Sequence, residues 1–251
     1  MIKFFRHIRQ RMIKENRVSK YLLYAIGEIV LVVIGILIAL QINTWNQQRE
    51  RNNQETIYLE DLRNDFLFDL ETLDQKVAQN DKAIENAKEV LTLISSKTDF
   101  SDEDKMKLYV LLLPLCGESY FIPEQGTIHQ IEASSSGNYI RNKALKDQIF
   151  RYHSSREREE KNMEQSIQIY QHHFITPNVL SIGMDPVFSE MAFNESYEFD
   201  PVDVSSLMKN KQFITALFMK SAGATNQNNV YRSVQKEAEQ IVALINDELK
   251  K

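Results

Sequence analysis

The residue types that most often do chemistry are sparse in this chain, and their spacing favours structural roles. No pair of histidines has the spacing that holds zinc on one helix face, and the adjacent His172 and His173 point to different faces of a helix. Cys116 is the only cysteine, and no base is marked beside it, so we expect a small buried side chain. The histidines are His7, His129, His153, His172 and His173. We therefore expect no metal site, no cofactor and no catalytic residue.

Motifs for phosphate and acyl chemistry are also absent. The chain has neither a Gly-Lys-Ser/Thr loop nor a Gly-x-Gly-x-x-Gly loop to hold phosphate. The run Ser134–Gly137 lacks the glycine that precedes the serine of a nucleophile elbow, and we interpret it as the end of a helix. Asp102 and Asp104 are interpreted as acids in the first turn of a helix.

Glu28 is the exception, because it lies inside an apolar segment. An ionisable side chain in a membrane span is costly and is by default a functional hypothesis. Gly35 and Ala39 fall on the same helical face, where small residues allow two helices to approach closely. Three interpretations stay open: a protonated glutamate in a helix–helix contact, a group that couples to protons or a partner, and incidental placement at the lipid edge.

The segment that carries Glu28 predicts a membrane anchor. Residues 22–42 are apolar except mainly for Glu28 and Gln41, and 21 helical residues span roughly 30 Å, the thickness of a bilayer core. Tyr24 and Trp45 lie near its ends, as in an aromatic belt. The run is too long for a cleaved signal peptide and lacks a small-x-small cleavage site. We expect a transmembrane helix over residues 21–44.

Charge predicts the orientation of this anchor. Residues 1–20 have a net charge of +6, whereas residues 29–251 have a net charge of −10. A basic flank places the N-terminus in the cytoplasm, and the acidic body predicts no nucleic-acid partner. The basic segment either lies along the membrane surface as an amphipathic helix or only sets the topology. Its charged residues are Lys3, Arg6, Arg9, Arg11, Lys14, Arg17 and Lys20.

A long helix is predicted to follow the anchor. Neither proline nor glycine occurs from Ile36 to Leu113, and apolar residues recur at steps of three and four from Leu59 to Ile94, with one stutter. This pattern predicts a coiled-coil-like helix from about Trp45 to Ser95, continuous with the membrane span. Asn80 sits in the series and either sets the register or faces a gap in a bundle. The series is Leu59, Leu62, Phe66, Leu70, Leu73, Val77, Asn80, Ile84, Ala87, Leu91 and Ile94.

The rest of the chain is predicted to be a helical bundle, which makes the fold class all-α. Helices are expected from Ser101 to Pro114, from a Thr127 cap to Gly137, from an Asn142 cap to Thr176, and from Ser206 to Leu249. Gly223 is expected to break or bend the last of these. Residues 177–205 contain three prolines and a glycine and are expected to form an irregular, packed loop. The extramembrane helical domain would thus comprise residues 45–251.

Two blocks resemble a known family. Residues 24–43, after the opening Met-Ile-Lys-Phe-Phe-Arg, resemble small Gram-negative membrane proteins grouped as the domain of unknown function numbered six thousand and ninety. Residues 127–152, with Ser136, Gly137, Asn142, Leu145 and Tyr152, are similar to a second block of that family, although Glu132–Asn138 is less apolar than its pattern. The resemblance implies an inner-membrane anchor with a periplasmic helical domain, and it implies no activity.

These observations predict a membrane-anchored helical interaction or scaffold protein that is oligomeric and not an enzyme. Its expected partners are the lipid bilayer and either a second copy or another membrane protein, bound through the transmembrane and coiled-coil helices. One alternative is a periplasmic sensor or ligand-binding module that uses residues 177–205. A second alternative is a subunit of a proton-coupled membrane complex in which Glu28 is the coupling group.

Substitutions on the Glu28 face distinguish these roles. A charge left alone in the bilayer costs roughly 3 kcal/mol on insertion scales, so Glu28 is expected to be protonated or paired. If the face packs against a partner, Glu28→Gln should be tolerated, while Gly35→Leu should disrupt assembly measured by light scattering in detergent. If Glu28 couples protons, Glu28→Gln should abolish function and leave assembly intact. Unchanged behaviour of both Glu28→Ala and Gly35→Leu would remove both interpretations.

Overall fold

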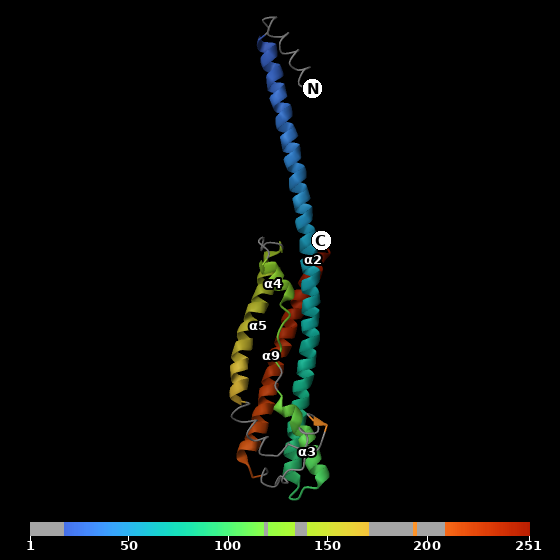
Figure 1. Cartoon of the computed structure of the whole chain (residues 1–251), viewed down its shortest axis with the longest axis vertical. Helices are drawn as coiled ribbons and strands as arrows, with labels where there is room; N and C mark the ends of the chain where they lie inside the picture. The colour runs from blue at the N-terminus through green and yellow to red at the C-terminus, as the bar shows by residue number, and fades with distance from the viewer. Residues whose placement is uncertain (1–17, 118–119, 134–139, 171–192, 195–208) are drawn as a thin grey trace. The chain divides into compact units, whose positions relative to one another are not determined.

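The structure is a computed structural model that describes residues 18–117, 120–133, 140–170, 193–194 and 209–251 (Figure 1). The described residues form five principal helices and no strand, so the predicted all-α class is confirmed. The chain divides into two compact units, residues 1–56 and residues 57–251. The helices are α2 (Val18–Ser96), α3 (Asp102–Cys116), α4 (Gly126–Ala133), α5 (Lys143–Tyr170) and α9 (Lys211–Leu249).

The helix α2 contributes to both units. It contains 79 residues, and the predicted continuity between the apolar segment and the coiled-coil-like segment is confirmed. Its two parts differ in burial. Residues 29–51 are exposed all round, whereas residues 55–94 bury one side of the helix. Residues 29–40 of the first part are thus apolar without a covering layer, and the second part is amphipathic.

The buried stripe of α2 follows a regular heptad register that includes polar residues. Continuing the steps of four and three from Leu62 and Phe66 reaches Asp69, which is 1% exposed. Four predicted members of the series, Leu70, Val77, Ile84 and Leu91, are half-buried, and Leu70, Val77 and Leu91 pack against the apolar clusters from the edge. The stripe consists of Leu59, Leu62, Phe66, Asp69, Leu73, Lys76, Asn80, Ala83, Ala87, Val90 and Ile94. The apparent stutter disappears once Asp69 is included.

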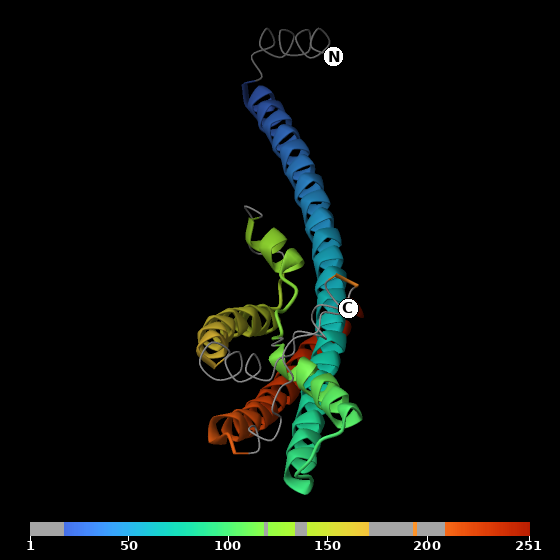
Figure 2. The same cartoon turned by 60° about the horizontal axis from the view of Figure 1, so that its bottom comes forward.

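Within the second unit (Figures 1 and 2), α9 contributes to the core along both parts of this stripe, with α4 and α5 at residues 59–73 and α3 at residues 83–94. The helix α9 runs antiparallel to α2. Asp74 is hydrogen-bonded to Gln235, whereas Asn80, later in α2, is hydrogen-bonded to Asn228, which is earlier in α9. The helix α5 packs against α9 and also reaches α2 through the rings of Tyr152 and Phe66, whose centroids are 5.0 Å apart. The second unit is therefore built around three long helices.

The core has two apolar clusters that occupy successive lengths of α2. One cluster joins residues 83–94 of α2 to α3 and to residues 213–217 of α9. The other joins residues 59–73 of α2 to α4, α5 and residues 231–245 of α9. Between them the two helices exchange polar contacts.

That polar layer centres on two asparagines. Asn80 donates from its amide nitrogen to the side-chain oxygen of Asn228 at 3.0 Å, and Asn228 donates to Asp81 at 2.7 Å. Asn228 is 2% exposed, so these bonds satisfy an amide that water does not reach. Because an apolar neighbour could not make these bonds, the layer favours one register of α2 against α9, which is one of the two roles considered for Asn80. The partner helix, however, belongs to the same chain.

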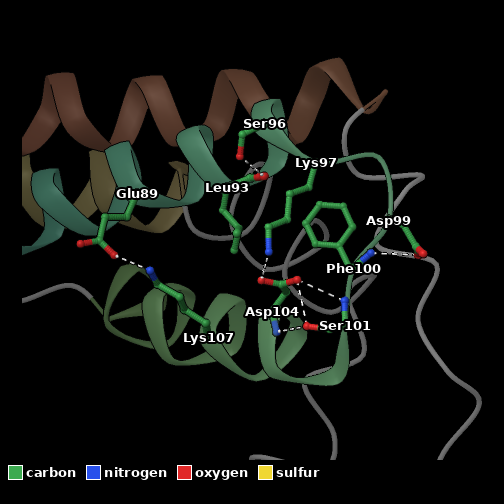
Figure 3. Close-up of polar contacts among 9 residues, drawn as sticks. All are labelled: Glu89, Leu93, Ser96, Lys97, Asp99, Phe100, Ser101, Asp104 and Lys107. Carbon is green, nitrogen blue, oxygen red and sulfur yellow. Dashed lines mark hydrogen bonds and ion pairs between the residues drawn. The ribbon is translucent and has the colours of Figure 1, made fainter.

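The turn from α2 to α3 is closed by local polar contacts (Figure 3). Ser101 accepts a hydrogen bond from the backbone N–H of Asp104, whose carboxylate accepts from the backbone N–H of Ser101, so the two form a capping box. Lys97 pairs with Asp104, and Lys107 lies 3.6 Å from Glu89 across the hairpin. The predicted start of α3 at Ser101 is confirmed.

Other predicted boundaries are partly right. Asn142 caps α5 by accepting from the backbone N–H of Leu145 at 3.1 Å, as predicted. The expectation that Thr127 caps α4 is wrong, because the helix begins at Gly126 and the N–H of Thr127 donates instead to Asp65 of α2 at 3.4 Å. The helix α9 continues through Gly223 without a break. Except for residues 193–194, the predicted loop 177–205 lies outside the described residues.

Replacing one asparagine of the polar layer should destabilise the bundle. Asn80→Leu removes a hydrogen-bond partner from buried Asn228 and should lower the free energy of unfolding by about 1–3 kcal/mol. Adding Asn228→Leu should recover part of this loss, because two apolar groups then face each other. Chemical denaturation of the full chain in detergent, followed by circular dichroism, measures both values. Additive losses in the double variant would contradict this coupling.

Candidate functional site

The membrane residues predicted from the sequence lie on α2 in the first unit. Glu28 is half-buried, whereas Gly35 and Ala39 are exposed, and a Cβ atom built at Gly35 would meet nothing within 4 Å. This face therefore has room for another helix. Among the predicted basic residues, Lys20 lies within α2, and the other six fall outside the described residues.

The helix α2 is apolar enough to cross a membrane. An 18-residue window within it has a mean hydropathy of 2.7, and none of that window is buried by the rest of the chain. In the described part of the chain it is the one helix that meets these criteria of length and composition. This is compatible with a single-pass anchor near the N-terminus.

The second unit contains a buried polar cluster centred on Asp69. One oxygen of this carboxyl group accepts a hydrogen bond from the backbone N–H of Glu124 at 2.9 Å. The other oxygen lies 3.2 Å from the hydroxyl of Tyr152 on α5. A single side chain of α2 thereby joins the connection before α4 to the helix α5.

Burial raises the pKa of Asp69 to about 7, from its usual value of 3.8. The hydrogen bonds from Glu124 and Tyr152 favour the charged form, but the negative charges of Glu124 and Asp65 oppose it. Desolvation is the largest effect, as expected for a carboxyl group that is 1% exposed. Asp69 can therefore bind and release a proton near neutral pH.

Tyr152 provides the link from Asp69 to α9. Its ring packs edge-on against Phe66, and the guanidinium of Arg156 lies 5.8 Å from its centroid. Arg156 in turn lies 3.6 Å from Glu237 of α9. Burial, followed by the charge of Asp69, raises the pKa of Tyr152 well above its ordinary value, so the hydroxyl keeps its proton.

His153 is a second unusual titratable group beside Tyr152. Both ring nitrogens are buried without a hydrogen-bond partner, and the ring lies 5.8 Å from that of Phe66. Burial lowers the pKa of His153 to about 4; the nearby Asp65 opposes this shift, and His129 adds to it. The imidazole is therefore neutral at any pH well above 4.

Asp69 was missed in the sequence because the predicted series of core positions took the adjacent apolar residue, Leu70, in its place. The signal that could have found it is the alternation of steps from Leu59, Leu62 and Phe66, which reaches position 69 without a stutter. Tyr152 stood out in the sequence only as part of the second block that resembles the family, and no pattern indicated that it meets Asp69. The burial of His153 was not visible in the sequence either.

The cluster around Asp69 can bind and release a proton, and it joins α2 to α5 and to the connection before α4. Among the described residues, no three His, Cys, Asp or Glu side chains are placed to hold a metal ion. A groove of about 700 Å³ runs between α5 and α9, close to the Arg156–Glu237 pair. Its lining is mostly polar and carries both signs of charge: Ala144, Asp147, Gln148, Arg151, Ser233, Lys236, Glu237 and Gln240.

Comparison with known proteins identifies a family but no activity. The model of DUF6090, a family of unknown function, matches residues 28–151, just under half of the chain. The resemblance seen in the sequence is therefore confirmed over the end of the apolar segment, the rest of α2, α3, α4 and the start of α5. No curated protein and no solved structure matches.

The cluster predicts opposite pH effects for two variants. Between pH 4 and 7, folded Asp69 holds a proton that the unfolded chain releases, whereas between pH 6.5 and 4 folded His153 lacks a proton that the unfolded chain binds. Relative to wild type, the free energy of unfolding of Asp69→Asn should fall by up to about 1.4 kcal/mol per pH unit as the pH is lowered from 7 to 4.

His153→Leu should show the reverse trend, with unfolding becoming harder relative to wild type as the pH falls from 6.5 to 4. Denaturation of the full chain in detergent at a series of pH values measures both profiles. Other titrating groups are common to all three proteins and cancel in the differences. Parallel profiles for wild type and the two variants would contradict the assignment.

Proposed function

Because residues 28–151 match a family without an assigned function, we propose a function from the structure: the chain is a membrane-anchored helical interaction protein. The observation that carries this proposal is the continuity of α2, which joins an uncovered apolar segment to the core of the bundle without a linker. A helix of this kind fixes the bundle to the bilayer and presents its surface to partners.

The exposure of the apolar segment supports the anchor. Large side chains from Leu22 to Ile42 are about half exposed or more, and apolar surface in water costs about 25 cal/mol per Å². A bilayer removes that cost while the helix satisfies its own backbone groups. The basic residues before the segment support a cytoplasmic N-terminus, and we propose on that ground that the bundle lies in the periplasm.

Self-association is proposed to use the membrane face of α2. The heptad stripe that first suggested a coiled-coil oligomer is covered by other helices of the same chain, α3, α4, α5 and α9, so a second copy would have to displace them. The face with Glu28, Gly35 and Ala39 needs no such rearrangement, because a Cβ atom at Gly35 has open space around it. Another membrane protein could dock on the same face.

The chemistry of the bundle supports binding over catalysis. Asp69 and Tyr152 are both engaged in joining helices, and Arg156 lies between Tyr152 and Glu237. A second candidate function, the recognition of a polar ligand, is favoured by the groove between α5 and α9. A binding screen of the full chain that yields a specific small ligand, lost on Arg151→Ala, would support this second candidate.

Cysteine labelling tests the anchor and its orientation. In a Cys116→Ser background, Gln47→Cys and Lys250→Cys should react with a membrane-impermeant maleimide applied to spheroplasts, because both positions follow the span. Lys14→Cys, before the span, is the matched control and should react only after lysis. Labelling of Lys250→Cys only after lysis would overturn the orientation. Release of the wild-type chain from membranes by alkaline carbonate would overturn the anchor.

A further inference from the structure

The connection between α3 and α4 is fastened by side chains of two other helices. We call residues 120–125 the clasp segment; it lacks helical structure, and its Phe121 and Pro123 are buried. The backbone N–H of Phe121 donates to the hydroxyl of Tyr231 on α9 at 3.2 Å. The backbone N–H of Glu124 donates to Asp69 on α2 at 2.9 Å. Of the two hydrogen-bond acceptors that hold the clasp segment, one is therefore a carboxyl group and the other is a hydroxyl.

The groups around Asp69 do not neutralise a negative charge. Asp65 on the same helix and Glu124 on the clasp segment are both acidic and both oppose ionisation. From α5, Tyr152 contributes a hydroxyl, and Arg156 lies on its ring, with Glu237 of α9 beside it. Nearby, the charge of Asp65 raises the pKa of His153 on α5, and His129 of α4 lowers it. The ionised carboxylate is thus buried next to two like charges.

Protonation of Asp69 keeps both of its contacts. The ionised carboxylate accepts from the N–H of Glu124 and from the hydroxyl of Tyr152. In the acid form, one oxygen still accepts from Glu124, while the other carries the proton and donates it to the tyrosine oxygen. The fastening geometry survives, and the buried charge disappears.

From this geometry we propose that Asp69 and the clasp segment form a proton-controlled latch, closed most firmly when Asp69 is protonated and opening more readily once the proton leaves. The reason lies in the open state. When the clasp segment lifts away, water reaches the carboxyl group, which ionises at its ordinary pKa, and loss of the proton therefore favours opening. The latch gives the bundle a response to pH that the proposed anchoring function does not require.

Hydrogen exchange of the full chain in detergent tests the latch. A peptide covering residues 120–127 reports opening, after correction for the chemical exchange rate at each pH. The corrected opening constant should rise by up to about tenfold per pH unit from pH 5 to 7 and then level off. His153 should not oppose this local effect, because its ring contacts lie with Phe66 and Tyr152, outside the clasp segment.

Two variants control the experiment. Asp69→Asn retains an acceptor for Glu124 and a donor for Tyr152 but cannot titrate, so its corrected opening should be the same at every pH. Tyr231→Phe removes the acceptor of the Phe121 N–H without touching Asp69, so it should raise opening by one factor at all pH values and keep the wild-type slope.

A flat wild-type profile between pH 5 and 8 would overturn the latch, and this result does not depend on whether any variant folds. A pH slope that persists in Asp69→Asn would also overturn it, because another group would then control the opening. Membrane anchoring can stand in either case, since labelling and carbonate extraction do not depend on the clasp segment.

Discussion

The bundle depends on one stripe of α2 being kept out of water although it contains a carboxyl group and an amide. Apolar members of the stripe gain stability simply by burial, wherever they pack. Asp69 and Asn80 are different, because each costs free energy when buried unless a specific partner meets it. Asn228 on α9, Tyr152 on α5 and the backbone of Glu124 supply those partners. The polar positions therefore decide which elements lie against the stripe, and at which register.

Much of this fold could be predicted from the sequence, because its signals are local. The long helix, the Ser101 and Asn142 caps and the polar role of Asn80 follow from periodicity, composition and capping chemistry. What covers the stripe could not be predicted, because a heptad pattern looks the same whether the partner is another chain or a later helix of the same chain. The heptad steps do reach Asp69, but the donors that make a buried carboxyl group tolerable there come from distant parts of the chain, which no local pattern reveals.

The two parts of α2 show how one helix serves two solvents. From residue 29 to residue 40 the helix is apolar on every side and exposed, which suits lipid. From Glu55 onward it is apolar on one side only, and that side is covered by protein. Glu28 lies in the first part, and Asp69 is buried in the second part. The carboxyl group in the bundle is satisfied by its own chain, whereas Gly35 and Ala39, on the same face as Glu28, leave open space.

The region that matches the family model covers only part of the second unit. It ends at Arg151, one residue before Tyr152, and it excludes α9 entirely. Without α9 the stripe of α2 would lose part of the cover in both core clusters, and Asn80 would lose its partner. Without Tyr152, one oxygen of Asp69 would lose its hydroxyl partner. The matched region therefore contains Asp69, Asn80 and one partner of Asp69, the backbone of Glu124, while Tyr152 and Asn228 lie in the rest of the chain.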